Sequence, residues 1–114
     1  MANPWAGEVA ITVDGERHVC KLTLGALAEL ETMLDAGGLI SLVERFEQGR
    51  FTTRDVLGLV VAGLRGGGWR GSAEDLRTAE IAGGPMVAAR AAAELLARAF
   101  ALPGEGLAGS TGRG

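Results

Sequence analysis

The chain begins with alternating apolar and polar residues. In the stretch EVAITVDGERHVCKL, Val9, Ile11 and Val13 alternate with Ala10 and Thr12, and this period of two predicts a β-strand. The Asp-Gly pair in its middle suits a two-residue type I′ turn, because both central residues of that turn have positive φ. We therefore predict a β-hairpin in which Val9 faces Cys20 and Ile11 faces His18. Its apolar face needs cover from helices, since an isolated hairpin is barely stable in water.

After the hairpin, apolar residues recur with helical spacing over most of the chain. Thr23, Thr52 and Ser72 stand where helix N-caps are expected, and the last two are followed three residues later by aspartate, as in a capping box. Glycines and Pro85 mark the remaining boundaries. The predicted helices span residues 24–36, 39–48, 53–65, 73–82 and 85–100.

The third of these helices contains the most apolar stretch of the chain, VLGLVVAGLR. A helix with almost no polar face lies at the centre of a core or is covered by another chain. Gly58 and Ala62 are four residues apart and form a notch where a second helix can approach closely. The sequence favours the central position and leaves coverage by a partner open.

The last helix is rich in alanine and has high helix propensity. Its predicted apolar stripe consists of Met86, Ala89, Ala93, Leu96 and Phe100. The segment LPGEGLAGSTGRG that follows has the composition of a linker. We therefore predict a mainly α protein, with an N-terminal β-hairpin and about five short helices packed in one small domain over residues 1–101. Residues 102–114 are predicted to form a flexible C-terminal tail.

The charge and length of the chain exclude several classes of function. The 114 residues carry a formal net charge of -3, which argues against a general nucleic-acid binder, because such proteins neutralise phosphates with clustered basic residues. The N-terminus lacks the features of a secretory signal, and the longest apolar run is too short to cross a bilayer. Cys20 is the only cysteine, which is compatible with a reducing compartment. We expect a cytoplasmic protein that binds neither nucleic acid nor membrane.

The stretch RGGGWRG, residues 65–71, resembles a ligand-binding loop only superficially. It lacks the lysine and hydroxyl of a phosphate-binding P-loop, and no strand precedes it as in a dinucleotide-binding fold. The preferred interpretation is a flexible connector in which Gly66 ends a helix and Trp69 inserts into a groove. Whether that groove lies on this chain or on a partner is open. Trp5 presents the same choice, between packing over the hairpin and anchoring another protein.

No group of residues has the pattern of a catalytic or metal site. His18 and Cys20 lie two apart on a strand and share a face, but that face is assigned to the core. Two nitrogen or sulfur ligands are too few for zinc. The carboxylates of the first helix lie opposite its leucines, on the face expected to contact solvent. We therefore expect no enzymatic activity, no cofactor, no metal and no small-molecule substrate.

Three segments together are similar to a known family. NPWAGEVAITVDGERHVCKLTLGALAELE, LISLVERFEQGRFTTRDVLGLVVAGLRGGG and GGPMVAARAAAELLARAF, in this order, resemble a small tail-module protein of gene transfer agents and related prophages. The resemblance covers roughly residues 3–101. The family has been labelled both a phage tail tube protein and a tail assembly chaperone, and it brings no catalytic residues.

The two labels imply different structures. A tube subunit is built on a β-sandwich or barrel, and a single hairpin supplies too little strand for that. The resemblance therefore implies an assembly chaperone that binds the tape-measure protein and promotes tube assembly, with a structural component of the finished particle as the alternative. Other tail proteins are further expected partners, and self-association is left open. The residues expected to contact a partner are Trp5, Val60, Leu64, Trp69 and Phe100.

Overall fold

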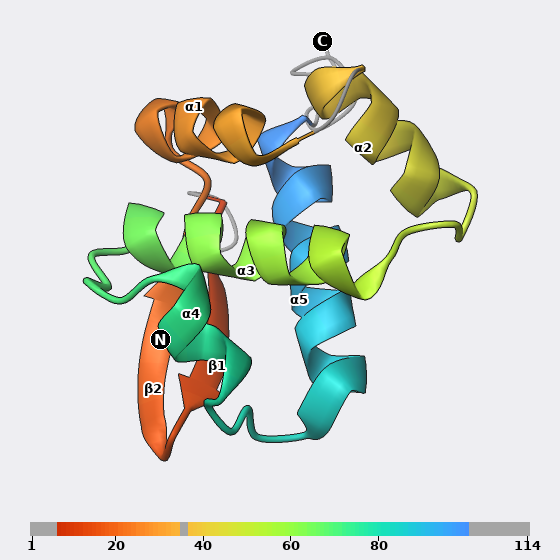
Figure 1. Ribbon diagram of the computed structural model, residues 1–114. Helices are drawn as coiled ribbons and strands as arrows, with labels where there is room; N and C mark the ends of the chain where they lie inside the picture. The colour runs from red at the N-terminus through yellow and green to blue at the C-terminus, as the bar shows by residue number, and fades with distance from the viewer. Residues whose placement is uncertain (1–6, 35–36, 101–114) are drawn as a thin grey trace, which may run out of the picture.

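The computed structural model describes residues 7–34 and 37–100, which form a hairpin and five helices (Figure 1). The strands are β1 (Val9–Val13) and β2 (Glu16–Cys20). The helices are α1 (Leu24–Met33), α2 (Gly38–Glu47), α3 (Thr53–Gly66), α4 (Ala73–Arg77) and α5 (Gly84–Ala99). The predicted fold class, mainly α with an N-terminal hairpin, is confirmed. The C-terminal tail predicted for residues 102–114 lies outside the described residues.

The hairpin has the predicted register, with Val9 opposite Cys20 in an antiparallel pair. Asp14 has φ 50° and Gly15 has φ 83°, the positive values that a type I′ turn requires. The apolar residues of β1 are buried, as the alternation predicts. The hairpin therefore turns one face toward the helices and leaves the other to solvent.

Helix α3 lies at the centre of the protein, between α1 and the hairpin, and α5 crosses it (Figure 1). Its residues 59–64 are all buried. The notch predicted on this helix receives α1, since a Cβ atom on Gly58 would lie 3.5 Å from Cδ1 of Leu30. The central-core interpretation of the apolar stretch is thus confirmed.

The predicted helix starts are present with their caps. The Thr23 hydroxyl accepts a hydrogen bond from the Ala26 N–H at 3.0 Å. Thr52 with Asp55, and Ser72 with Asp75, form complete capping boxes at the starts of α3 and α4. These caps satisfy backbone N–H groups that have no partner inside the helix.

Helix α4 is shorter than predicted: it ends at Arg77, whereas the sequence pattern indicated a helix to residue 82. The residues that follow pair with the edge of β1. The Asp14 N–H donates to the Glu80 carbonyl at 2.7 Å, and the Ala82 N–H donates to the Thr12 carbonyl at 3.0 Å. Tertiary pairing with a strand edge has therefore overridden local helix propensity.

The buried face of α5 also differs from the prediction. Of the predicted stripe only Leu96 is buried, and Met86, Ala93 and Phe100 are exposed. The residues buried instead are Ala88, Ala91, Ala92, Leu95 and Leu96. The prediction was wrong because apolar residues occur nearly all around this alanine-rich helix, and docking on α3 selects the face. That docking is tight, since a Cβ on Gly63 would lie 2.6 Å from Cδ1 of Leu95.

Candidate protein-docking groove

An apolar hollow opens between α3, α4 and the first turns of α5, with a volume of about 600 Å³. We call it the α3–α5 groove. Its lining residues are Phe51, Thr52, Thr53, Val56, Leu57, Val60, Leu76, Arg77, Ala79, Ile81, Gly84, Pro85, Met86, Ala88 and Ala89. Arg77 is the only charged residue among them, so the groove suits an apolar surface of another protein.

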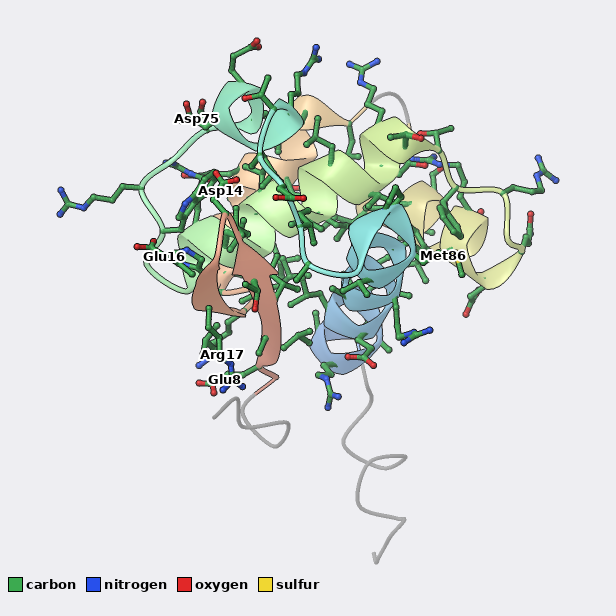
Figure 2. The ribbon with its side chains drawn as sticks, turned by 90° about the horizontal axis from the view of Figure 1, so that it is seen from below. Glu8, Asp14, Glu16, Arg17, Asp75 and Met86 are labelled. Atoms are coloured by element: carbon green, nitrogen blue, oxygen red, sulfur yellow. The ribbon has the colours of Figure 1, made fainter. Side chains whose placement is uncertain are left out.

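The groove forms because three elements meet there without filling the space between them. Helix α5 packs closely on α3 at Leu95, but Ala89 and Met86 lie about 1.7 and 2.5 turns earlier along α5. Helix α4, with five residues, is too short to cover the space. The floor includes Val60 and Ala88, which are buried, and the rim includes Phe51 and Met86, which are exposed. Met86 lies on the first turn of α5, far from Asp14 and Glu16 at the hairpin tip (Figure 2).

A second hollow of about 370 Å³ adjoins the groove, between α1, α2, α3 and α4. Leu57 and Arg77 line both hollows. Arg45 and Arg54 also line the second one. We call Arg45, Arg54 and Arg77 the arginine cluster. Asp55 lines the same hollow, so these four residues together give the border a net positive charge.

Within the cluster, Arg45 has a structural partner. Its guanidinium donates two hydrogen bonds to the Asp55 carboxylate, at 2.9 and 2.8 Å, and one to the Ser41 hydroxyl at 2.9 Å. The Asp55 carboxylate also accepts from the Thr52 N–H at 2.9 Å. The Arg45 guanidinium is the largest influence on the pKa of Asp55 and holds it below its usual value. This ion pair ties α2 to the start of α3 and fixes one wall of the second hollow.

Arg54 and Arg77 differ from Arg45 because both are exposed. Within residues 7–34 and 37–100, no carboxylate lies within ion-pair distance of either guanidinium. Both side chains can therefore pair with acidic groups of another molecule.

The residues predicted to contact a partner are not brought together. Val60 and Leu64 are 1% and 0% exposed, in the core of this chain, and only Val60 reaches the groove, at its floor. Phe100 is 42% exposed at the end of α5, away from the groove lining. Trp5 lies outside the described residues. Partner contact through these positions stays a prediction, and the lining residues Phe51 and Met86 are groove residues that the sequence did not indicate.

The first two glycines of the RGGGWRG stretch pack closely against the hairpin. The interpretation of this stretch as a flexible connector was therefore wrong at these two residues. A Cβ atom on Gly66 would collide with the Lys21 carbonyl, and one on Gly67 would collide with the Val19 carbonyl. Only glycine permits so close an approach between two backbones. Trp69 is partly buried and packs against the core of its own chain, beside the first turn of α1.

Cys20 and His18 do not form a nucleophile and base. Cys20 is fully buried, and this burial raises the pKa of its thiol to about 12, which keeps it protonated at neutral pH. Nε2 of His18 lies 3.8 Å from a carboxylate oxygen of Glu16 instead. The described part of the chain holds no group of three potential metal ligands among His, Cys, Asp and Glu. It also holds no helix long and apolar enough to span a bilayer. The expected lack of enzymatic activity stays a prediction.

Comparison with protein families decides the affiliation. The family model described as "Phage tail tube protein, GTA-gp10" matches residues 6–102. The chain belongs to this family. Curated proteins and solved structures gave no match. The resemblance inferred from the sequence is therefore confirmed, and the protein is related to phage tails, while the family description does not separate a structural role from a role in assembly.

Proposed function

We propose that this protein is a tail assembly chaperone, which binds the tape-measure protein and promotes assembly of the tail tube in the cytoplasm of the bacterial host. The observation that carries the proposal is the α3–α5 groove. It offers an apolar surface open to solvent, and amphipathic helices commonly bind in grooves of this kind. A chaperone of a long protein needs such a surface and no reaction centre.

The sheet content supports this role over that of a tube subunit. In the described part of the chain, the sheet has two strands and one isolated bridge, between Val13 and Ile81. That bridge and the neighbouring hydrogen bonds occupy part of the free edge of β1. A subunit that closes a continuous β-wall with its neighbours needs long, open strand edges on both sides of its sheet.

Co-expression tests the proposal. The tape-measure protein encoded with this chain is produced alone, with the wild-type protein and with Met86→Glu, and its soluble fraction is measured. Ile40→Glu is the matched control, because Met86 and Ile40 are both 74% exposed but Ile40 lies on α2 and lines neither hollow. We expect the wild type and Ile40→Glu to keep the tape-measure protein soluble and Met86→Glu to do so less well. Equal solubility with and without this chain would refute the chaperone role.

The family description favours a second candidate function, a structural component of the finished tail. Quantitative mass spectrometry of purified particles separates the two. A chaperone is absent from the particles or present in traces, whereas a component is present in a fixed copy number relative to the other tail proteins.

A further inference from the structure

We infer that the segment bound in the α3–α5 groove is an amphipathic helix with acidic residues along one flank. The inference rests on the proposed function, whose partner it describes chemically. Arg77 of the arginine cluster lines the groove, and Arg45 and Arg54 line the second hollow beside it.

The groove is walled by aliphatic side chains from α3 and α5, and the rim residue Met86 is 74% exposed. Methionine is unbranched and adapts its shape to different apolar partners. An inserted helix would place its apolar stripe against Val56, Leu57 and Ala89.

Two exposed arginines carry the positive charge at the border of the groove. Arg77 lines both the groove and the second hollow, and Arg54 lines the second hollow. Neither has a carboxylate within ion-pair distance in the described residues, whereas Arg45 pairs with Asp55. A helix lying in the groove brings one flank to Arg54 and Arg77. Acidic side chains on that flank gain two ion pairs, and basic side chains there are repelled.

A second copy of this chain matches the groove less well than a helix of another protein. The exposed outer face of α2 carries Ile40 with Glu44 and Glu47, a single large apolar residue beside two acids. One isoleucine cannot fill a groove of about 600 Å³. A longer apolar stripe, which another protein supplies, matches the size of the groove better.

Two synthetic peptides test the inference without the tape-measure protein. Both are amphipathic helices of about five turns with the same leucine and alanine face, one with glutamates and the other with lysines along the flank. We expect the glutamate peptide to bind the full-length protein at least about tenfold more tightly by fluorescence anisotropy. Equal affinities, or no binding of either peptide, would overturn the inference.

Charge reversal then locates the effect. Arg54→Glu with Arg77→Glu should reverse the preference between the peptides, because the border of the groove becomes acidic. The control variant is Arg17→Glu with Arg70→Glu, which changes the net charge by the same amount at two arginines that line neither hollow. This variant should keep the wild-type preference. Circular dichroism confirms that each variant is folded. If the reversed pair unfolds, Arg54→Gln with Arg77→Gln should abolish the preference in a folded protein.

The remaining outcomes separate the two proposals. An unchanged preference in the reversed variant contradicts the inference, as does a concentration-dependent dimer that Met86→Glu dissociates in sedimentation velocity. A tape-measure protein kept soluble by a chain with no peptide preference contradicts the inference and leaves the proposed function standing. A chain that prefers the glutamate peptide but leaves the tape-measure protein insoluble supports the inference and contradicts the proposed function.

Discussion

The two ends of helix α3 are held in different ways. At the C-terminal end the closest contacts are between backbones: the Lys21 N–H donates to the Gly63 carbonyl at 2.9 Å, and Gly66 and Gly67 lie directly against the end of the hairpin. The side-chain contact there, between Arg65 and Glu29, is exposed. At the N-terminal end they are made by the Asp55 side chain, whose carboxylate accepts hydrogen bonds from the Arg45 guanidinium and from the Thr52 N–H.

This difference explains where the groove lies. Backbone contact closes the C-terminal end on the side of the hairpin, and the hollow that remains there, beside Arg65 and Trp69, is smaller, at about 250 Å³. Side-chain contacts at the other end hold α2 and α3 apart at a distance set by the ion pair, and the apolar surface of the first turns of α3 remains open. Stability is therefore concentrated at one end of the helix and binding surface at the other.

The largest expected effect comes from Gly66→Ala. The added methyl group collides with the Lys21 carbonyl, and we expect a loss of about 3 kcal/mol in the free energy of unfolding. Gly58→Ala is the control in the same helix, because its Cβ would lie 3.5 Å from Leu30, an ordinary contact distance. This substitution should leave the free energy of unfolding unchanged or raise it by up to about 1 kcal/mol. Urea denaturation measures both, and equal midpoints would contradict close packing at Gly66.

An intermediate effect is expected for Asp55→Asn, which removes the partly buried ion pair with Arg45 and part of the capping box. We expect a loss of about 2 kcal/mol at pH 7 by urea denaturation. Asp75→Asn is the control, because Asp75 has the same position in an exposed capping box, and its loss should be smaller.

The ion pair between Asp55 and Arg45 predicts a pH dependence of the free energy of unfolding. Because the pKa of Asp55 is lowered in the folded protein, its contribution is fully present above the unfolded pKa of about 3.9 and is lost as the pH falls through the folded value. The stability difference between wild type and Asp55→Asn should therefore shrink below about pH 4. A difference that stays constant down to pH 2 would contradict the assigned ion pair.

The smallest effect is expected at the C-terminal end, for Glu29→Gln. Nε of Arg65 lies 2.9 Å from the Glu29 carboxylate, but both side chains are exposed, and solvent and salt screen the pair. The unfolding midpoint should shift less than in Asp55→Asn. The shift should vanish at about 1 M NaCl. A shift as large as that of Asp55→Asn would mean that both ends of α3 depend on ion pairs.

The sequence predicts the features that local chemistry determines. The hairpin register follows from alternation and the Asp-Gly turn, and the starts of α3 and α4 follow from capping boxes. Each of these signals lies within a few residues of the feature it predicts.

The features that the sequence did not predict depend on distant parts of the chain. Helix α4 ends early because Glu80 and Ala82 bond to β1. The buried face of α5 is selected by docking on α3, which exposes Met86 and so creates the rim of the groove. The glycine-rich segment around Gly66 has the composition of a linker. Only the position of the hairpin shows that residue 66 must be glycine, because a Cβ atom there would collide with a backbone carbonyl.

Hydrogen–deuterium exchange of this protein with and without the tape-measure protein tests the central claim most directly. The account predicts slower amide exchange on binding at residues 53–57 and 84–89, which border the groove, and no change at residues 9–20 of the hairpin. Protection confined to the hairpin, as expected for strand pairing in a tube, or no protection at all would contradict it.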